Sequence, residues 1–366
     1  MRKRRFRTWI FACLAAGLLV VLYLLYAFFW RGMGEPNPKQ NFTNTDPALY
    51  KTEKQLKRMV SLRFRKLSKQ VRRMYVIPGL KTAESLQGEF RAPAVCTSMT
   101  PQGLCVTEQY LFISAYCHTG RHNSVLFMLD RTTGEYIKTI VLGSRAHVGG
   151  IAYDPEHRNV WVAGGVNGVA KAGCYTLDSL VEYDIHGNEP LPAFRNYTLS
   201  SIARNSYMTY AERALLVGLF RKNGESVLEW FRLAEDGGLS TNPELMNLLR
   251  QNLPDDDGDD IVETDFSAIT SSIIQGISYD PPWLLFSKSY GIFDSAIQVH
   301  GWAEGRASFR NHEADQEVRF PQKLEQICVA DGELYCLFES AAYAYSAQPA
   351  LKVDRILVFD LADILA

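Results

Sequence analysis

The stretch EQICVADGELYCLFES, residues 325–340, consists of two apolar segments joined by Asp331-Gly332. An Asp-Gly pair between apolar runs predicts a β-hairpin. A second stretch, QGISYDPPWLLFSKSY at residues 275–290, has the same layout. Three further stretches repeat it, at residues 102–116, 149–164 and 200–220. Recurrence of one unit at intervals of tens of residues is the signature of a repeat architecture.

The spacing of these repeats identifies the kind of unit. They start at residues 103, 150, 201, 276 and 326, so the intervals are 47, 51, 75 and 50 residues. A four-stranded propeller blade takes about 40–50 residues. An Asp-rich insert at residues 240–270, expected to be partly helical around residues 243–249, explains the long interval. The sequence therefore predicts an all-β fold, a single β-propeller of five four-stranded blades over residues 76–366.

A third strand is expected in each repeat, after a polar pair that follows the hairpin. The pairs are Asn123-Ser124, Asp178-Ser179, Glu225-Ser226, Asp294-Ser295 and Asp354-Arg355. The predicted strands are 125–130, 180–185, 227–233, 296–302 and 356–361. In the first repeat, Thr133-Gly134 turns into a fourth strand.

One position in each repeat is occupied by a small residue, two places after its start. These residues are Cys105, Ala152, Ala203, Ser278 and Cys328. The innermost strands of a propeller line a narrow channel in which large side chains would collide, so Cys105 and Cys328 are interpreted as buried, reduced thiols. A disulfide such as Cys117–Cys174 would need an oxidising compartment and is not settled by spacing.

The sequence leaves open which segment closes the ring and how many blades the ring has. Residues 76–94 are expected to supply an outer strand that completes the C-terminal blade. If that segment and the insert formed another blade, the ring would have six. An eight-stranded sandwich is the remaining alternative.

The N-terminus predicts a membrane anchor. Residues 8–30 contain no charged side chain and are long enough to cross a lipid bilayer as a helix. The basic residues in 1–7 place the N-terminus in the cytoplasm, which puts the propeller outside it. A cleaved signal peptide is disfavoured because the apolar run is long and no small-x-small site follows Trp30. We therefore expect a single-pass protein of the cell membrane.

Residues 31–75 read as a linker followed by a basic amphipathic helix from residue 48 to residue 75. Its apolar positions recur at steps of three and four: Leu56, Val60, Phe64, Leu67, Val71 and Met74. Its other face carries Lys54, Lys57, Arg58, Arg65, Lys66, Lys69, Arg72 and Arg73. This helix could pack against the propeller or a second copy with its basic face in solvent, or lie on anionic lipids or a wall polymer.

Charge divides the chain into two parts. Residues 1–75 contain 17 Lys/Arg and 3 Asp/Glu, whereas residues 76–366 contain 22 and 37. An acidic body disfavours nucleic-acid binding, because phosphate contacts need a basic face.

The sequence from about Val95 to Leu365 resembles bacterial extracytoplasmic β-propeller proteins, most of which have no assigned activity. The resemblance rests on three features: the Gln-Gly at 275–276, the Ser-Lys-Ser-Tyr-Gly at 287–291 and the Leu-Phe-Glu-Ser-Ala-Ala at 337–342. The third repeat departs from it, with Ser200-Ser201 and Asn205 in place of glycines. The resemblance implies a secreted or membrane-anchored propeller and implies no catalytic residues.

The candidate site is the mouth of the propeller, where the loops before the innermost strands meet the ends of the second strands. The first group of residues is Gln102, His147, Gln275 and Glu325, and the second is Tyr116, Ser289, Tyr290, Glu339 and Ser340. His118 and His122 follow in the next loop. We predict a pocket for a polar ligand such as a sugar, a peptidoglycan fragment or a wall polymer. Alternatively, the Gln and Glu side chains tie neighbouring blades together.

The sequence is compatible with two classes of function. The preferred hypothesis is an anchored binding or scaffolding module for an envelope component or protein partner. The alternative is a hydrolase of a glycan or lactone, with Glu325 and Glu339 as an acid/base pair. No cofactor and no metal site are predicted: the His118–His122 spacing falls in a loop, and the acidic run 255–260 lacks the alternation of a calcium loop.

Overall fold

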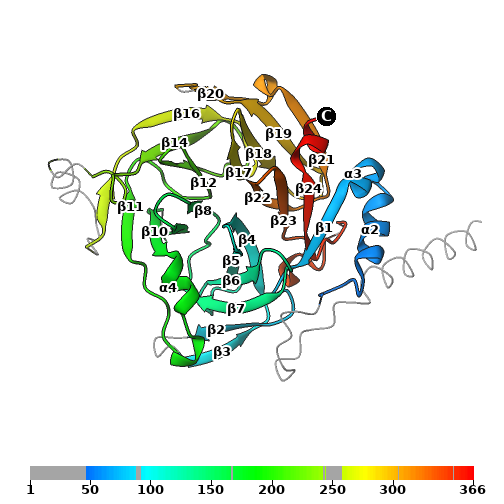
Figure 1. Ribbon diagram of the computed structural model, residues 1–366, viewed down its shortest axis with the longest axis horizontal. Helices are drawn as coiled ribbons and strands as arrows, with labels where there is room; N and C mark the ends of the chain where they lie inside the picture. The colour runs from blue at the N-terminus through cyan, green and yellow to red at the C-terminus, as the bar shows by residue number, and fades with distance from the viewer. Residues whose placement is uncertain are drawn as a thin grey trace, which may run out of the picture. The chain divides into compact units, whose positions relative to one another are not determined.

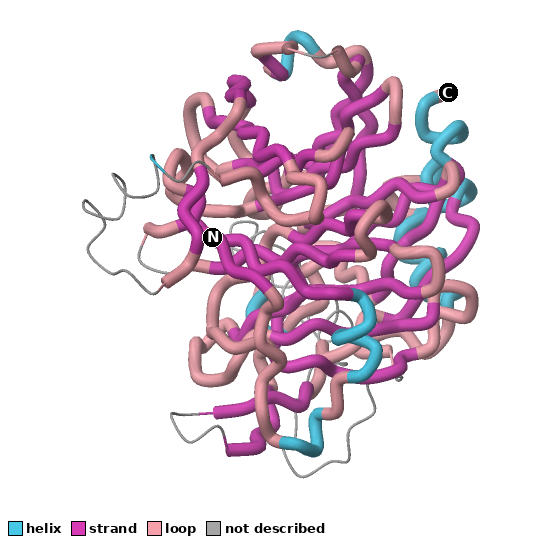
Figure 2. Tube along the Cα trace, turned by 60° about the vertical axis from the view of Figure 1, so that its left-hand side comes forward, coloured by secondary structure: helices cyan, strands magenta, loops and turns pink. Residues whose placement is uncertain are grey.

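Five antiparallel sheets surround a central axis in the computed structural model (Figure 1). The structure describes residues 47–87, 92–165, 168–241, 244, 258–303, 305–348 and 350–366. Strands dominate this part of the chain, and its helices are short (Figure 2). The predicted transmembrane helix at residues 8–30 and the linker from residue 31 to residue 46 lie outside the described residues. No helix within the described ranges is long and apolar enough to cross a bilayer.

The sheets are the blades of a five-bladed β-propeller. Blade 1 contains β4 (Met99–Val106), β5 (Tyr110–Cys117), β6 (Val125–Asp130) and β7 (Tyr136–Val141). Blade 2 contains β8 (Ile151–Asp154), β9 (Asn159–Gly164), β10 (Ala170–Thr176) and β11 (Arg195–Leu199), with β15 (Asp260–Val262) added in parallel. Blade 3 contains β12 (Tyr207–Ala211), β13 (Ala214–Gly218), β14 (Ser226–Arg232) and β16 (Phe266–Thr270), with β20 (Ser308–Phe309) added in parallel.

Blade 4 contains β17 (Ile274–Asp280), β18 (Trp283–Lys288), β19 (Ser295–Gly301) and β21 (Gln316–Phe320). Blade 5 contains β22 (Leu324–Ala330), β23 (Glu333–Phe338), β24 (Arg355–Asp360) and β1 (Val71–Val76). The innermost strands β4, β8, β12, β17 and β22 contact one another in that order, and β22 contacts β4. The ring is therefore closed, and the prediction of five blades is confirmed.

The closing strand comes from a different segment than predicted. β1 pairs antiparallel with β24, with Met74 opposite Leu357 and Val76 opposite Arg355. Most of the segment expected to close the ring, residues 76–94, instead contributes to the hairpin β2 (Ala83–Gln87) and β3 (Ala92–Cys96). The hairpin β2–β3 lies beside β7 of blade 1.

The predicted helix over residues 48–75 is wrong in its extent but right in its buried face. The structure has α2 (Glu53–Ser61), which begins at a Thr52 capping box, and α3 (Arg65–Gln70). The chain then becomes β1, because the free edge of β24 offers hydrogen bonds that outweigh local helix propensity. All six apolar positions are buried against blades 4 and 5: Leu56, Val60, Phe64, Leu67, Val71 and Met74.

The basic residues of this segment partly neutralise acidic groups of the propeller. Arg63 lies 2.8 Å from Asp294, Arg72 pairs with Asp360, and Arg73 pairs with Glu333. The segment therefore packs against the propeller, and most of its other basic side chains are exposed.

Two predictions within the repeats are corrected. In blade 3 the innermost strand begins at Tyr207, so Ala203 lies exposed in the preceding loop and Thr209 takes the small channel position. In blade 2 the expected strand at residues 180–185 is α4 (Leu177–Glu182) followed by a 3-10 turn, η1 (Ile185–Gly187). The third strand of that blade is β10, which ends just before Asp178-Ser179.

The insert is also shorter than predicted, because Asp260–Val262 and Phe266–Thr270 are strands of blades 2 and 3. The part expected to be helical, residues 243–249, lies outside the described residues except for residue 244. The six cysteines within the described ranges are unbonded thiols, including Cys105 and Cys328 in the channel.

Candidate functional site

A pocket of about 500 Å³ opens at the end of the channel where the innermost strands begin. We call it the mouth pocket. Five of the predicted site residues line it: Gln102, His147, Gln275, Glu325 and Glu339. They come from blades 1, 4 and 5 and from the loop before β8, and the fold brings them together across 237 positions of sequence.

Glu325 and Glu339 form a buried carboxyl pair in the mouth pocket. Each is 3% exposed. Gln102 donates a hydrogen bond from Nε2 to Glu339 Oε2 at 3.0 Å, and Lys323 Nζ lies 3.4 Å from Glu339 Oε1. Glu325 Oε1 has no hydrogen-bond partner in the structure. Both Glu339 oxygens therefore have a polar partner, whereas Oε1 of Glu325 is buried without one.

Burial raises the pKa of both groups, and raises that of Glu325 well above its usual range. The neighbouring Glu339 charge raises the Glu325 pKa further, whereas the Lys323 ammonium offsets part of the rise for Glu339. Two adjoining carboxyl groups cannot easily both ionise, and the pKa of Glu325 is raised further than that of Glu339.

Aromatic side chains and imidazoles form one wall beside this pair. The Tyr116 and His147 rings lie 4.2 Å apart between centroids, and the Tyr116 hydroxyl is 3.0 Å from His118 Nδ1. The His147 side chain is solvent-accessible, but surrounding protein and the Arg204 charge lower its pKa, so it is neutral at pH 7. The wall offers flat ring faces together with polar edges.

Four predicted residues point elsewhere. Ser289 and Ser340 are buried: Ser289 accepts a hydrogen bond from Ser295 Oγ, and Ser340 Oγ accepts one from the Val353 amide. Tyr290 is 39% exposed and lies beside Phe220, a residue of the pocket rim. His122 is buried behind the wall, against Cys117. The two serines are structural residues.

Tyr345, Lys323 and Arg204 belong to the site but were not predicted from the sequence. Tyr345 lies in η3 (Tyr343–Tyr345), within the long connection from β23 to β24, and its ring is 4.0 Å from Lys323 Nζ. Lys323 stands two residues before Glu325, so its proximity to one carboxyl group was open to inference. The irregular connection around η3 has no sequence pattern that would predict the position of Tyr345 at the pocket.

Hydrogen bonds between blades also exist, as the alternative interpretation expected. Gln326 Nε2 of blade 5 donates to Ile277 O of blade 4 at 2.7 Å, and the bond from Gln102 to Glu339 joins blades 1 and 5. A side chain at the neighbouring Gly276 would approach Gln326 Cα to 2.6 Å, so glycine is needed there. Glu325, the preceding residue, faces the mouth pocket instead.

The carboxyl pair differs from the arrangement in typical glycosidases. Those enzymes hold two carboxyl groups about 5–10 Å apart with the scissile bond between them. Here the groups are in hydrogen-bonding contact with each other. The observed geometry therefore leaves no room for a sugar between them.

The other end of the channel has a pocket of about 330 Å³. There Arg131 donates a hydrogen bond to Thr107 O at 3.1 Å and pairs with Asp331 at 2.7 Å. The pair with Asp331 joins blade 1 to blade 5, so Arg131 has a structural role.

Comparison with known proteins finds distant structural similarity and no family. No protein family and no curated protein matches the sequence. Among solved structures, a periplasmic gluconolactonase of Pseudomonas aeruginosa, PpgL, is 12% identical with a TM-score of 0.36, covering 69% of this chain and 68% of that one. A chain of the mitotic checkpoint complex is 6% identical with a TM-score of 0.40, covering 80% and 95%.

This chain spans less than two thirds of the length of two other similar structures. They are the Kuenenia stuttgartiensis hydrazine synthase, at 10% identity and a TM-score of 0.36, and the Dos1 propeller, at 9% and 0.34. The match covers 65% and 75% of this chain, but only 55% and 62% of theirs. The closed ring of five sheets itself defines the chain as a β-propeller.

Proposed function

We propose that this protein is a membrane-anchored, extracytoplasmic binding propeller whose mouth pocket takes a neutral, hydroxyl-rich ligand such as a glycan of the cell envelope. The observation that carries the proposal is the convergence of Gln102, Gln275 and the Glu325–Glu339 pair on one pocket. The sequence supports the anchor, through the uncharged run at residues 8–30 and the basic residues before it.

The chemistry of the mouth pocket matches hydroxyl groups. The two glutamines offer amide donors and acceptors, Glu339 offers a carboxylate, and Glu325 offers a protonated carboxyl group. Tyr345 and Phe220 add ring faces on which the apolar face of a sugar can lie. The one buried negative charge is balanced by Lys323.

Binding is favoured over hydrolysis by the contact between the two carboxyl groups. A second candidate function keeps some support, because a protonated Glu325 at neutral pH is a usable general acid. Such a hydrolase would need another group to activate water. If the purified protein cleaves a glycan or lactone and Glu339→Gln abolishes the cleavage, hydrolysis replaces binding as the assignment.

The segment after the anchor suits a position close to the membrane. Lys54, Arg65, Lys66 and Lys69 are exposed on α2 and α3. We propose that this face lies against anionic lipid headgroups or a wall polymer while the mouth pocket is free to bind ligand.

The test is a binding screen of the full-length protein in detergent against neutral and anionic oligosaccharides of bacterial envelopes. A neutral oligosaccharide should bind, and Gln275→Ala should weaken it about tenfold, which is 1.4 kcal/mol. Gln109→Ala is the matched control, since Gln109 is an exposed glutamine in the β4–β5 turn. Equal affinity of both variants, or binding only of a protein partner, would contradict the proposal.

A further inference from the structure

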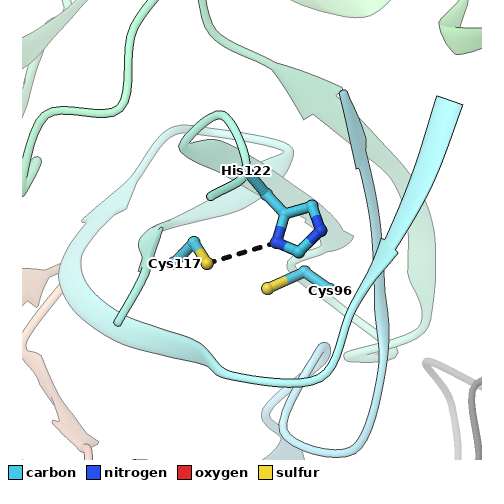
Figure 3. A group of neighbouring side chains, drawn as sticks. All are labelled: Cys96, Cys117 and His122. Carbon is cyan, nitrogen blue, oxygen red and sulfur yellow. Dashed lines mark hydrogen bonds between the residues drawn. The ribbon is translucent and has the colours of Figure 1, made fainter. Parts of the chain in front are cut away.

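A second polar cluster lies on blade 1, away from the mouth pocket. It consists of Cys96, Cys117 and His122, and we call it the thiol cluster (Figure 3). The three side chains are buried, with exposures of 0%, 3% and 8%. Their two sulfur atoms and a ring nitrogen lie within 4.8 Å of one another, and Cys117 Sγ is 3.2 Å from His122 Nδ1. Three potential metal ligands are therefore already gathered around one point.

Three separate segments supply these ligands. Cys96 ends β3 of the outer hairpin, Cys117 ends β5, and His122 lies in the loop before β6. Backbone contacts hold the segments in register: Gln87 forms an isolated bridge with His122, and the Asn123 amide donates to Leu86 O at 2.9 Å. The hairpin is thus fixed against blade 1 on either side of the ligands.

Hydroxyl groups surround the Cys117 sulfur on its other sides. Thr119 Oγ1 lies 3.2 Å away and Ser98 Oγ lies 3.6 Å away. A thiolate at this position would be stabilised by these hydroxyls and by an imidazole N–H. The surroundings of Cys117 are therefore suited to an anionic sulfur, the form in which cysteine binds metals.

The other cysteines lack this environment. Cys105 and Cys328 face each other at the channel, and Cys336 and Cys174 are buried in blades 5 and 2. Within the described ranges, only the thiol cluster gathers three ligand-type side chains in this way.

We propose that Cys96, Cys117 and His122 bind a thiophilic d10 metal ion, Zn²⁺ or Cu⁺. Two thiolates and one imidazole form a soft donor set, which both ions favour. Cu⁺ is satisfied by three such ligands, whereas Zn²⁺ needs a fourth, for which the Thr119 and Ser98 hydroxyls or a water are at hand. Binding releases the thiol protons and joins the β2–β3 hairpin to blade 1. This differs from the expectation of no metal site.

The competing state of the cluster is a Cys96–Cys117 disulfide. A disulfide needs two cysteines and gives no role to the imidazole. The approach of His122 Nδ1 to the same sulfur, at 3.2 Å, favours metal over disulfide. The inference does not depend on the proposed glycan binding, because the mouth pocket contains none of the three residues.

The test uses the full-length protein, purified under reducing conditions and stripped of metal with a chelator. Zn²⁺, or Cu⁺ under anaerobic conditions, is added and the excess removed, and retained metal is measured by mass spectrometry. One equivalent of one of these ions should remain. Co²⁺ should give sulfur-to-cobalt absorption bands, a readout that requires thiolate ligands and no activity.

Variants identify the ligands. Cys96→Ser and Cys117→Ser should abolish retention, and His122→Gln should weaken affinity at least tenfold. Cys174→Ser, a buried thiol of blade 2, should retain one equivalent. Circular dichroism checks folding, and Cys96→Ser, at the end of the outer hairpin, keeps the test decisive if Cys117→Ser misfolds.

Three outcomes would overturn the inference. The first is retention of no metal by protein with free thiols. The second is unchanged affinity in His122→Gln. The third is a protein isolated without reductant whose mass shows two hydrogens lost between Cys96 and Cys117, and which takes up metal neither before nor after reduction.

Discussion

The mouth pocket and the thiol cluster meet at a single strand end. Tyr116, at the end of β5, contacts His147 in the mouth, and Cys117, the next residue, contacts His122 in the thiol cluster. Successive residues of a strand point to opposite faces, so one strand end serves two environments. One is open and rich in oxygen and nitrogen groups, and the other is closed and rich in sulfur. The comparison shows that burial alone does not define a binding site. The donor atoms that line the site determine which kind of ligand it can bind.

The largest expected effect concerns the buried charge of the mouth pocket. Glu339→Leu should lower the free energy of unfolding by about 3 kcal/mol, because Lys323 and Gln102 lose their buried partner. Glu333→Leu, at the other end of β23, should cost less than about 1 kcal/mol, since its pair with Arg73 is partly solvated. Urea unfolding measures both. Similar losses would mean that the Glu339 contacts are no stronger than surface pairs.

The next largest effect is stabilisation by metal, which is expected to depend on the thiol cluster and not on the mouth pocket. Zn²⁺ or Cu⁺ at about 100 times its dissociation constant should stabilise the protein by about 2.7 kcal/mol. Cys117→Ala should remove this stabilisation, whereas Gln275→Ala should keep it. Thermal melts with and without metal provide the measurement. Loss of the metal effect in both variants would show that the two regions are not independent.

The pH dependence of stability comes from the mouth pocket. Because the pKa of Glu325 is raised in the folded protein, folding binds a proton that the unfolded chain releases near its ordinary pKa of about 4.3. This contribution is present at low pH and is lost as pH rises through the folded pKa. Glu325→Gln should therefore flatten the decline of stability above pH 5. Melting temperatures of both proteins between pH 5 and pH 9 test this, and parallel curves would contradict it.

The smallest effect comes from the strand end that the two regions share. Tyr116→Phe removes the hydrogen bond with His118 and should cost about 0.5–1 kcal/mol. The His118 resonances should move in an NMR spectrum, while metal affinity of the thiol cluster stays the same. A change in metal affinity would indicate that the side chains of Tyr116 and Cys117 are coupled.

The repeats were predictable because each blade begins with a local hairpin. The apolar segments around Asp331-Gly332 define blade 5 within 16 residues, and blades 1 and 4 follow the same pattern. Blade 3 was misplaced because Ser200–Ile202 imitates a strand start, whereas the strand begins at Tyr207. Thr209, instead of Ala203, is the small residue that blade 3 places at the channel, because the channel wall limits side-chain size.

Contacts between distant segments were not predictable. The edge of β24 takes its partner from Val71–Val76, about 280 positions earlier, and an amphipathic pattern there favoured helix. Five mouth residues were found because the repeat assigns them to the same end of the ring. The thiol cluster escaped because Cys96 belongs to a hairpin outside the repeat, and Tyr345 escaped because its loop has no pattern.

The proposed function depends most on Glu325 and Glu339 sharing a proton at the wall of the mouth pocket. Infrared spectroscopy of the full-length protein at pH 7 tests it through the carbonyl stretch of a protonated carboxyl group. We expect one such band in the native protein, its loss in Glu325→Gln, and a shift when a binding oligosaccharide is added. Absence of the band, or a band that Glu325→Gln and saturating oligosaccharide leave unchanged, would contradict the claim.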